Sequence, residues 1–386
     1  MMRIAVDARF YNEAGPGRYV KNIIGELEKL DSKNSYFILL RKDAYTSYFP
    51  KAFNFTKILA DYPWYSFSEQ ILFLFTVIFL KTDIFYVPHF NVPVFYPGKL
   101  VTAIPDLIMH DYSTEEGTTL PRKYYKFKKL LYFFVVFMAV LKSKKIIVPS
   151  MATLSDMKQH YKFVTDSKLV LAYEGIDKKI VESSKETAKV SDTLLLEDLE
   201  IRKPYLLYVG SMYLHKNVDR LLQAFRILKD EKRFEGCLVI IGKKDQFSAK
   251  IKELAQKLFG DNSVLLPGES QYIDDDKLSI IRRNALCYVF PSLKEGFSLT
   301  PLEAMVFNVP CVISDIACHK EIYGKACLYF NPLDPKDMAE KIDLMITDEQ
   351  VRERLRDEVS TLLAKYDWAN TAADTLKVFE GVFKDG

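Results

Sequence analysis

Short apolar runs that end in glycine, proline or serine recur along this chain, and helical patterns separate them. In the first half these runs are residues 3–8, 83–88, 100–106 and 145–150. In the second half they are residues 205–210, 237–242, 263–268, 286–292 and 310–315. Apolar runs that alternate with amphipathic helical patterns are typical of parallel sheets covered by helices. The pattern therefore predicts an α/β protein with doubly wound parallel sheets, whose ligands bind where the strands end.

Two series of strands in 386 residues predict two domains, because one hydrophobic core rarely serves more than about 300 residues. The segment 168–180 and the polar stretch 181–200 that follows it separate the two series and are the expected hinge. We predict a first Rossmann-like domain over residues 1–172 and a second over residues 173–367, facing each other across a central cleft. The helix at about 368–386 is expected to pack back on the first domain.

The composition excludes some classes of partner. A net charge of +3 gives no general attraction to nucleic acid. The odd number of cysteines has no spacing typical of a metal or redox motif: Cys237, Cys287, Cys311, Cys318 and Cys327. Reduced thiols are typical of the cytoplasm. The start, MMRIAVDARF, reads as a strand rather than an export signal, so we predict a cytoplasmic protein.

Two stretches, residues 71–80 and 130–141, are apolar throughout, but each is shorter than the roughly 20 residues of a membrane-spanning helix. Basic residues without any acidic residue surround the second one: Arg122, Lys123, Lys126, Lys128, Lys129, Lys142, Lys144 and Lys145. Such a segment, 122–145, would suit peripheral contact with an anionic membrane at its inner face. A buried helix with solvated basic ends explains it equally well. Both interpretations stay open at this point.

The stretch PSLKEGFSLTPLEAM, residues 291–305, places Glu295 and Glu303 on either side of a loop between a strand and a helix. Residues 300–303 have the spacing of a capping box, which would explain Glu303 by helix initiation alone. That explanation leaves Glu295 and Gly296 without a role. Backbone N–H groups at a helix start suit a phosphate, and carboxylates accept hydrogen bonds from sugar hydroxyls. The loop therefore predicts a site for a phosphorylated sugar.

A second loop runs from Gly210 and Ser211 to His215, Lys216 and Asn217, and an amphipathic helix follows it. Asn217 is the expected N-cap of that helix. Lys216 then lies near a helix N-terminus, where a cation is unfavourable unless an anion lies between them. A diphosphate would resolve the conflict, whereas an exposed lysine that points into water would need no ligand.

The first strand-to-helix turn contains Gly15 and Gly17, which would let a ligand approach the backbone, although an ordinary turn is the commoner explanation of such a pair. The acidic run 274–276 precedes a helical pattern, where carboxylates favour the helix dipole. We therefore interpret that run as a helix start and predict no metal site.

Together these stretches resemble the family 4 glycosyltransferases, which are retaining enzymes of the GT-B fold, over nearly the whole chain. The most specific part runs from Phe290 to Asp315 and includes the two glutamates with seven residues between them. Weaker matches are DAR and GPGRY near the N-terminus, VGSMYLHKN, LPGES at 266–270 and NPLDPKDMAEKI at 331–342. The resemblance implies that the second domain binds a nucleotide sugar and that the first domain receives the acceptor.

The same resemblance implies roles for single residues. Glu303 would hold the ribose, and Glu295 would lie against the donor sugar. Backbone groups of the segment after Gly296 would contact the phosphates or the sugar: Phe297, Ser298, Leu299 and Thr300. Lys216 would neutralise the departing diphosphate, so that no metal or other cofactor is required.

Three further glycines complete the implied donor site. Gly15 and Gly17 would let the first domain close on the diphosphate, and Gly268 and Glu269 would lie near the base. His215 stands where many family members carry arginine, and it is a weaker, pH-dependent cation.

A second departure concerns the acceptor side. Members often have His-Asp after a strand of the first domain, whereas this chain has Pro105 followed by Asp106. Asp106 and His110 are then the candidates for contacting acceptor or sugar hydroxyls. The missing histidine also motivates the alternative of a non-catalytic partner that binds a nucleotide sugar or glycan for an active transferase.

The sequence leaves the base, the sugar, the acceptor, the linkage and the oligomeric state open, and the resemblance alone favours GDP-mannose over a UDP-sugar. An epimerase or phosphorylase on this scaffold is less favoured, because both loops fit transfer. We therefore predict a retaining hexosyltransferase that uses a nucleotide-sugar donor and a glycan or lipid-linked acceptor in polysaccharide or glycoconjugate synthesis.

Overall fold

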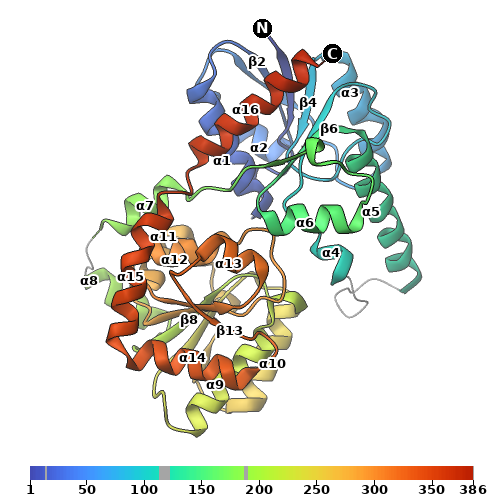
Figure 1. Ribbon diagram of the computed structural model, residues 1–386. Helices are drawn as coiled ribbons and strands as arrows, with labels where there is room; N and C mark the ends of the chain where they lie inside the picture. The colour runs from blue at the N-terminus through green and yellow to red at the C-terminus, as the bar shows by residue number, and fades with distance from the viewer. Residues whose placement is uncertain (14, 113–121, 187–189, 386) are drawn as a thin grey trace. The chain divides into compact units, whose positions relative to one another are not determined.

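The structure is a computed structural model that describes residues 1–13, 15–112, 122–186 and 190–385. It divides into two compact units, one formed by Met1–Gly175 with Tyr366–Gly386 and the other by Ile176–Lys365. Each unit contains one sheet with helices packed along it (Figure 1). The chain passes between the units at Gly175 and at Lys365, where the sequence analysis placed boundaries at 172 and 367.

The first unit is built on a seven-stranded parallel sheet with the order β3-β2-β1-β4-β5-β6-β7. Its strands are β1 Arg3–Asp7, β2 Ser35–Leu40, β3 Phe55–Leu59, β4 Ile84–Val87, β5 Leu100–Ala103, β6 Ser143–Val148 and β7 Leu169–Leu171. Its helical segments are α1 Gly15–Leu30, α2 Lys42–Ser47, the π-helix η1 Glu69–Phe73, α3 Leu74–Phe79, α4 Ile108–Asp111, α5 Arg122–Lys142, α6 Met151–His160, the 3-10 turn η3 Asp166–Lys168 and α16 Trp368–Lys384. Because the strand order reverses between β1 and β4, the predicted doubly wound arrangement is confirmed for this unit.

The second unit has a six-stranded parallel sheet with the order β10-β9-β8-β11-β12-β13. Its strands are β8 Tyr205–Val209, β9 Cys237–Ile241, β10 Val264–Leu265, β11 Cys287–Phe290, β12 Cys311–Ser314 and β13 Leu328–Phe330. Its helical segments are α7 Lys178–Ser184, α8 Val190–Asp198, η4 Leu214–Lys216, α9 Val218–Asp230, α10 Gln246–Phe259, η5 Pro267–Glu269, α11 Asp275–Arg283, α12 Leu299–Val306, α13 Ala317–Tyr323, α14 Pro335–Thr347 and α15 Glu349–Leu363. The five cysteines all lie in this unit and are buried as free thiols.

Every strand that the apolar runs predicted is present, but β2, β3, β7 and β13 were not predicted. β3, β7 and β13 are edge strands of their sheets and none of them is fully buried, and β7 and β13 have only three residues each. β2 lies inside its sheet, but it leads into Arg41 rather than into glycine, proline or serine. β2 therefore lacks the turn-forming residue on which the prediction depended, and the three edge strands lack the length or the full burial of the predicted strands.

The C-terminal helix α16 packs in the first unit against α1, β4 and β6 (Figure 1). Asp367 caps it by accepting a hydrogen bond from the backbone N–H of Ala369 at 2.9 Å. Phe379 contacts the ring of Tyr86 in β4, and Lys99 Nζ donates to the carbonyl oxygen of Val382 at 2.9 Å. The helix therefore completes the first unit, although nearly 200 residues of the second unit precede it.

The DAR motif at the end of β1 forms a buried ion cluster. The guanidinium of Arg9 pairs with Asp7 at 2.7 Å and with Glu69 of η1 at 2.6 Å, and all three side chains are almost completely buried. Glu69 also accepts a hydrogen bond from Asn91 Nδ2 at 2.6 Å. One guanidinium thus lies between two carboxylates, and its charge offsets part of the cost of burying them at the carboxyl end of the first sheet.

Candidate functional site

The two loops that the sequence singled out in the second unit lie together at the carboxyl edge of its sheet. They follow β8 and β11, which are neighbouring strands. The backbone N–H of Leu293 donates to the carbonyl oxygen of His215 at 2.7 Å. Asn217 Nδ2 donates to the carbonyl oxygens of Pro291 at 3.0 Å and Pro332 at 2.7 Å. These bonds hold both loops against the end of β13.

Asn217 is thus the residue before α9, as predicted, but its side chain does not cap the helix. Its backbone has a φ of 59°, in the left-handed region that asparagine tolerates better than most residues. The amide side chain instead joins the three loops, and its Oδ1 accepts a hydrogen bond from Arg220 at 2.8 Å. The predicted capping role was wrong because the side chain has partners that are far away in the sequence.

Lys216 and Glu295, the two proposed catalytic residues of this unit, form an ion pair at 2.6 Å. The side chains are 17% and 7% exposed, so the lysine does not simply point into water. Its ammonium also lies 5.4 Å from the centre of the Phe290 ring. Burial alone would raise the pKa of Glu295, but the charge and hydrogen bond of Lys216, together with weaker influences of Ser292 and His319, hold that pKa below its ordinary value. Glu295 is therefore a carboxylate at neutral pH, partly screened by a cation.

The loop after Glu295 leads directly into α12, which begins at Leu299 rather than after Thr300. Gly296 and Phe297 are buried in this loop. Ser298 is the N-cap, with a φ of 74° and no capping hydrogen bond from its side chain. Its carbonyl oxygen accepts a hydrogen bond from Tyr323, which helps to hold the unusual backbone. The predicted capping box was wrong.

Positive φ is uncommon for a serine, and such backbone strain concentrates at ligand sites. The first turn of α12 also carries the positive end of the helix dipole without a capping hydroxyl at Ser298. A phosphate oxygen would satisfy both features, because it accepts hydrogen bonds from backbone N–H groups at a helix start. Leu299 and Thr300 supply the first two N–H groups, and Pro301 has none.

Glu303 is 1% exposed and forms a buried ion pair with Arg282 of α11. Sequence reasoning missed Arg282, because it lies 21 residues before its partner in another helix. Its Nε is buried without a hydrogen-bond partner among the described residues. A ribose hydroxyl that contacts Glu303, as the resemblance implies, would thus meet a carboxylate that already has a cation.

Three glycines let the loops after β8, β9 and β10 approach one another closely. A Cβ atom on Gly268 would lie 2.6 Å from the carbonyl oxygen of Gly242, and one on Gly242 would lie 2.5 Å from that of Gly210. The neighbouring Ser211 carbonyl accepts a hydrogen bond from Tyr208 at 2.6 Å. Gly242 was not predicted, because a lone glycine after a strand is an ordinary turn signal. The room beside Gly210 and Gly268, which the sequence analysis assigned to a ligand, is therefore occupied at least in part by other atoms of the protein.

Glu269 follows Gly268 in the turn η5, and Ser248 Oγ at the start of α10 donates a hydrogen bond to its carboxylate. Lys244 Nζ donates to the Glu269 backbone oxygen at 2.8 Å. Glu269, which was predicted to lie near the nucleotide base, is therefore at the carboxyl edge of the sheet, beside the start of α10.

His319 of α13 is a fully buried histidine that the sequence analysis did not single out. Its Nδ1 lies 2.9 Å from the carbonyl oxygen of Ser314, so Nδ1 carries the proton and Nε2 is an acceptor. Nε2 is buried without a partner among the described residues. The centre of the His319 ring lies 5.6 Å from that of the Phe290 ring, which is also 5.4 Å from the Lys216 ammonium.

His319 should make folding stability depend on pH. Burial lowers the pKa of His319 to about 4, from an ordinary value of 6.5. Between these values the unfolded chain binds a proton that the folded protein does not, so the free energy of unfolding falls as the pH drops from 6.5 towards 4. The slope from one histidine reaches at most about 1.4 kcal/mol per pH unit. Urea unfolding at pH 7, 6 and 5 should show a smaller slope for His319→Gln than for the unchanged protein. Equal slopes would contradict a neutral, buried imidazole.

The predicted glycines of the first unit differ in their surroundings. A Cβ atom on Gly17 would lie 2.6 Å from the carbonyl oxygen of Tyr11 and 2.7 Å from that of Phe10, whereas one on Gly15 would meet nothing within 4 Å. Both residues are in the first turn of α1, which packs against the loop after β1. Neighbouring backbone oxygens therefore leave no room for a side chain at Gly17.

This difference gives a matched pair of variants. Gly17→Ala is expected to lower the free energy of unfolding by about 1–3 kcal/mol, because two backbone oxygens must move. Gly15→Ala should change it little, since alanine favours a helix and meets no atom there. Chemical denaturation of both variants measures the difference. Equal stability of the two variants would mean that the loop after β1 moves away at little cost.

The acceptor-side candidates lie after β5 in the first unit, Asp106 in the loop before α4 and His110 in α4. Asp106 Oδ1 accepts a hydrogen bond from the backbone N–H of Ile108 at 2.9 Å. His110 has Tyr161 Oη at 2.8 Å from Nε2 and Tyr132 Oη at 3.1 Å from Nδ1. Both ring nitrogens of His110 therefore have tyrosine partners, and an acceptor hydroxyl would have to displace one of them.

The acidic run before α11 is a helix start, as predicted. Asp274 is the N-cap and accepts a hydrogen bond from the backbone N–H of Lys277 at 2.8 Å. Within the described ranges, no three side chains of the metal-ligating types are grouped as a metal site would need.

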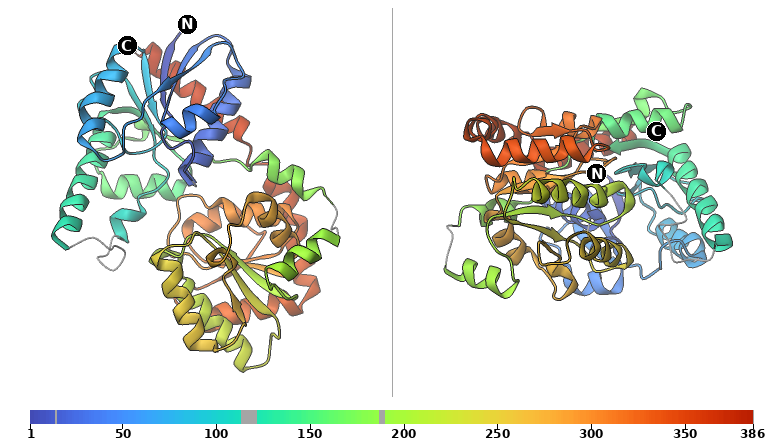
Figure 2. Two further views of the ribbon diagram at one scale, coloured as in Figure 1. Left: turned by 180° about the vertical axis from the view of Figure 1, so that it is seen from behind. Right: turned by 90° about the horizontal axis from the view of Figure 1, so that it is seen from below.

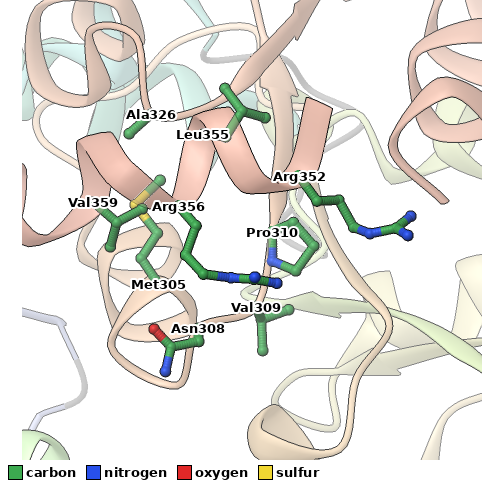
Figure 3. A pocket seen from close by; sticks show the side chains of 9 residues that line it. All are labelled: Met305, Asn308, Val309, Pro310, Ala326, Arg352, Leu355, Arg356 and Val359. Carbon is green, nitrogen blue, oxygen red and sulfur yellow. The ribbon is translucent and has the colours of Figure 1, made fainter. Parts of the chain in front are cut away.

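A small pocket in the second unit lies away from the candidate site (Figure 3). Pro310 and Ala326, which line it, precede β12 and β13, so the pocket is at the amino ends of these strands. Arg352 and Arg356 of α15 form its other side. Ligands of doubly wound sheets bind at the opposite edge, so we do not assign a function to this pocket.

Comparisons with known proteins agree with this geometry. Residues 196–360 match the family model described as "Glycosyl transferases group 1". The O-antigen chain mannosyltransferase RfbU of Salmonella typhimurium is 24% identical over 246 residues, which are 63% of this chain and 61% of RfbU. A second relative, of Campylobacter jejuni, is 26% identical over 277 residues, 69% of this chain and 68% of the relative. Its name is N-acetylgalactosamine-N,N'-diacetylbacillosaminyl-diphospho-undecaprenol 4-alpha-N-acetylgalactosaminyltransferase.

Among solved structures, WaaG, a glycosyltransferase involved in lipopolysaccharide biosynthesis, has a TM-score of 0.73 at 16% identity, over 98% of this chain and 99% of WaaG. This similarity shows the fold alone, and it confirms the predicted GT-B architecture. The match over residues 196–360 confirms the resemblance to the family 4 type of glycosyltransferase. The chain spans less than two thirds of the length of RfbU.

Proposed function

Because residues 196–360 belong to the glycosyl transferases group 1 family, on a GT-B fold, we propose that this protein transfers a hexose from a nucleotide sugar to a glycan or lipid-linked acceptor. The observation that carries the proposal is the Lys216–Glu295 ion pair beside the strained, uncapped start of α12. A cation, a carboxylate and a helix N-terminus converge there at the carboxyl edge of a parallel sheet. A donor molecule offers a matching set of groups, namely a diphosphate and the hydroxyls of two sugars.

In the proposed mechanism the diphosphate binds at the start of α12 and near Lys216. As the bond between the anomeric carbon and the diphosphate oxygen breaks, its electron pair remains on that oxygen. Lys216 and the N–H groups of Leu299 and Thr300 stabilise the growing negative charge. The acceptor hydroxyl oxygen bonds to the anomeric carbon on the face that the diphosphate leaves, and its proton leaves with the diphosphate. We propose that the anomeric configuration is therefore retained.

Glu295 takes the place next to the donor sugar in this proposal, where its carboxylate accepts hydrogen bonds from sugar hydroxyls. Glu303 binds the ribose while Arg282 compensates its charge. Since Lys216 and α12 supply the positive charge, we propose that transfer needs neither a metal ion nor another cofactor.

Mannose remains the favoured sugar, supported by the mannosyltransferase name of RfbU, with GDP-mannose as the donor and a UDP-sugar as the alternative. A lipid-linked acceptor is supported by the undecaprenol diphosphate in the name of the Campylobacter jejuni relative. We therefore place the reaction on the cytoplasmic side of the membrane, in polysaccharide or glycoconjugate synthesis, with residues 122–145 in peripheral contact with the bilayer.

A thermal-shift screen tests the donor assignment. One nucleotide among GDP, UDP and ADP, together with its sugar, should raise the melting temperature far more than the others. At a concentration of about 100 Kd the stabilisation is expected to be about 2.7 kcal/mol, because only the folded protein binds the ligand. The same donor should then support turnover with a glycan or lipid-linked acceptor. Absence of any shift with all three nucleotide series would contradict a nucleotide-sugar site.

The second candidate function is a non-catalytic partner that binds nucleotide sugar or glycan for an active transferase. Two observations favour it, namely Pro105 in place of the usual histidine and the two tyrosine partners of His110. Tight nucleotide binding by calorimetry without turnover across a full donor panel would support this candidate over catalysis.

A further inference from the structure

The first sheet reverses its strand order in the same way as the second. In the second sheet the order reverses between β8 and β11, and Lys216 and Glu295 lie after these two strands. In the first sheet it reverses between β1 and β4. Helices cover both faces of this sheet, so a ligand reaches it at the strand ends (Figures 1 and 2). Ligands of doubly wound sheets bind outside the carboxyl ends of the strands at such a reversal, which in the first unit means the loops after β1 and β4.

His89, which follows β4, has its ring fixed between two phenylalanine rings. The ring centres of Phe10, which follows β1, and of Phe90 lie 4.4 Å and 4.0 Å from that of His89. Two rings so close cannot share one face of the imidazole, so Phe10 and Phe90 cover opposite faces. Phe10 also stacks on Trp64, which follows β3, at 4.5 Å. Loops after three strands therefore hold the imidazole in one orientation at the carboxyl edge of the sheet.

The hydrogen bond of His89 determines which ring nitrogen carries the proton. The backbone N–H of Asn91 donates to Nδ1 at 3.2 Å, so in the neutral ring Nδ1 is an acceptor and Nε2 carries the proton. Burial and the nearby Arg9 guanidinium lower the pKa of His89 to about 3, so the ring is neutral at neutral pH. Among the described residues nothing accepts a hydrogen bond from Nε2, and the residue is 7% exposed. Since both faces and Nδ1 are covered, the edge of the ring that carries Nε2 is the part left open.

Asn91 connects this loop to the buried ion cluster of the first unit. Its Nδ2 donates to Glu69, which pairs with Arg9. Asn91 is completely buried, yet its Oδ1 has no partner among the described residues. Buried polar atoms are nearly always paired, so an unpaired one indicates that a hydroxyl group or an ordered water binds there. The loop after β4 thus offers a donor, His89 Nε2, and an acceptor, Asn91 Oδ1.

The charges around this loop favour an uncharged ligand. Arg9 faces the carboxylates of Asp7 and Glu69, so these three groups sum to −1 when both acids are ionised. The guanidinium of Arg41, at the other end of the ring stack, pairs with Asp61. A phosphate or carboxylate at the imidazole would therefore be repelled by the cluster, whereas a sugar hydroxyl brings no charge.

The loop after β5 offers no comparable group. β4 and β5 are neighbouring strands, so His89 and Pro105 follow adjacent strand ends. The proline has no hydrogen-bonding side chain, and both ring nitrogens of His110 have tyrosine partners. The imidazole with an open donor edge therefore lies after β4 rather than after β5.

We propose that His89 binds the acceptor sugar through a hydrogen bond from Nε2–H to one of the sugar's hydroxyl oxygens. Asn91 Oδ1 accepts a hydrogen bond from the same sugar or from a water that bridges to it. The inference rests on the proposed function and names its acceptor class, which is a glycan whose contacting sugar is uncharged. His89 is then a binding and specificity-determining residue of the first unit.

Two substitutions of His89 separate sugar binding from support of the loop. The side-chain oxygen of asparagine can replace Nδ1, whereas the side-chain amide of glutamine can reach the position of Nε2. His89→Asn should lower kcat/KM for the acceptor about three- to tenfold, the effect of one hydrogen bond, and His89→Gln should lower it less. Nucleotide affinity, measured by calorimetry, should be the same in both variants, because the donor site lies in the second unit.

Binding of the acceptor sugar is also measured without donor, by saturation-transfer NMR. The neutral probes are p-nitrophenyl mannoside, glucoside and galactoside, and the anionic probes are the glucuronide and galacturonide. These probes are water-soluble, so recognition of the sugar is tested apart from any lipid that carries it. The chain itself has no helix, within the described ranges, that is long and apolar enough to cross a bilayer.

The matched control is Phe95→Asn, which changes an exposed ring between β4 and β5. It should bind the glycosides as the unchanged protein does. Weaker binding of the neutral glycosides by His89→Asn, with binding kept in His89→Gln and Phe95→Asn, supports the proposal.

Three results would overturn it: equal effects of the two His89 substitutions, stronger binding of the glucuronide than of the glucoside, or no binding of any neutral glycoside by the unchanged protein. Failure of the proposed function gives a different result, since the unchanged protein would then bind no nucleotide and transfer no sugar, whatever its affinity for glycosides.

Discussion

Glu295→Gln is expected to lower the turnover number for sugar transfer by about 100- to 1,000-fold, the effect of removing one preorganised polar group from an active site. The carboxylate is buried, lies 2.6 Å from Lys216 Nζ, and has a lowered pKa. Glutamine has the same shape but no charge, so the field at the anomeric carbon changes and the Lys216 ammonium loses its partner. Turnover is measured with the donor that the thermal-shift screen identifies, and nucleotide binding is measured by calorimetry.

The control for this variant is Glu253→Gln on α10, where the glutamate is exposed. It should keep the turnover of the unchanged protein. Lys216→Gln provides a second test, because it removes the other half of the pair and should slow transfer while weakening binding of the diphosphate. Intact turnover in Glu295→Gln, in a protein with an unchanged melting temperature, would refute the proposed role of the ion pair.

Arg282→Met is expected to lower the free energy of unfolding by about 3–5 kcal/mol, because it leaves the Glu303 carboxylate buried without its cation. Both side chains are at most 2% exposed, so water cannot replace the lost partner. Chemical denaturation measures the loss. Arg226→Met on α9 is the matched control, since its partner Asp230 and the arginine itself are both exposed and the loss there should be small.

The double variant Arg282→Met with Glu303→Leu separates the ion pair from packing. It removes both charges and should recover much of the stability that Arg282→Met loses, because no uncompensated charge remains. It should also bind the nucleotide more weakly if Glu303 holds the ribose. If Arg282→Met does not fold, Arg282→Gln, which also removes the cation, serves instead. A loss of stability as small as that of Arg226→Met would show that water reaches Glu303.

The strands that carry the candidate site were predictable because each of them is a buried central strand with a clear end. YLLYV and CYVF are fully buried, and a turn follows both. Glu295 stood out because the capping box left it without a role, and the roles of Glu295 and Lys216 came from the family resemblance, since an exposed lysine was an equally simple explanation of Lys216. Glu303 had such an explanation in the capping box, and the structure replaced it with an ion pair.

The contacts of single residues could not be predicted where their partners are distant in the sequence. Asn217 fits an N-cap by its position, but its amide group donates to residues 74 and 115 positions away. His319 and Arg282 lie in ordinary helical patterns, and nothing next to them in the sequence indicates that they are buried near the two glutamates. Gly17 and Gly15 look alike in GPGRY, yet only Gly17 is enclosed by backbone atoms.

The exposed apolar residues of α3 and α5 show the same division between local sequence and packing. Hydrophobicity alone identified residues 71–80 and 130–141, but it did not tell which sides of these helices would remain exposed. That outcome depends on how much of each helix the sheet and its neighbours can cover.

By itself the sequence determined the alternation of strands and helices, the two domains and the loops at the strand ends, because these follow from the local order of apolar, polar and turn-forming residues. The tertiary structure decided which charges are paired, which glycines are enclosed and which apolar sides remain uncovered. Lys216 and Glu295 are 79 positions apart, and only the neighbouring placement of β8 and β11 brings them within 2.6 Å. Ion pairs and burial are short-range in space, and the distance between two side chains is set by the packing of the elements that carry them.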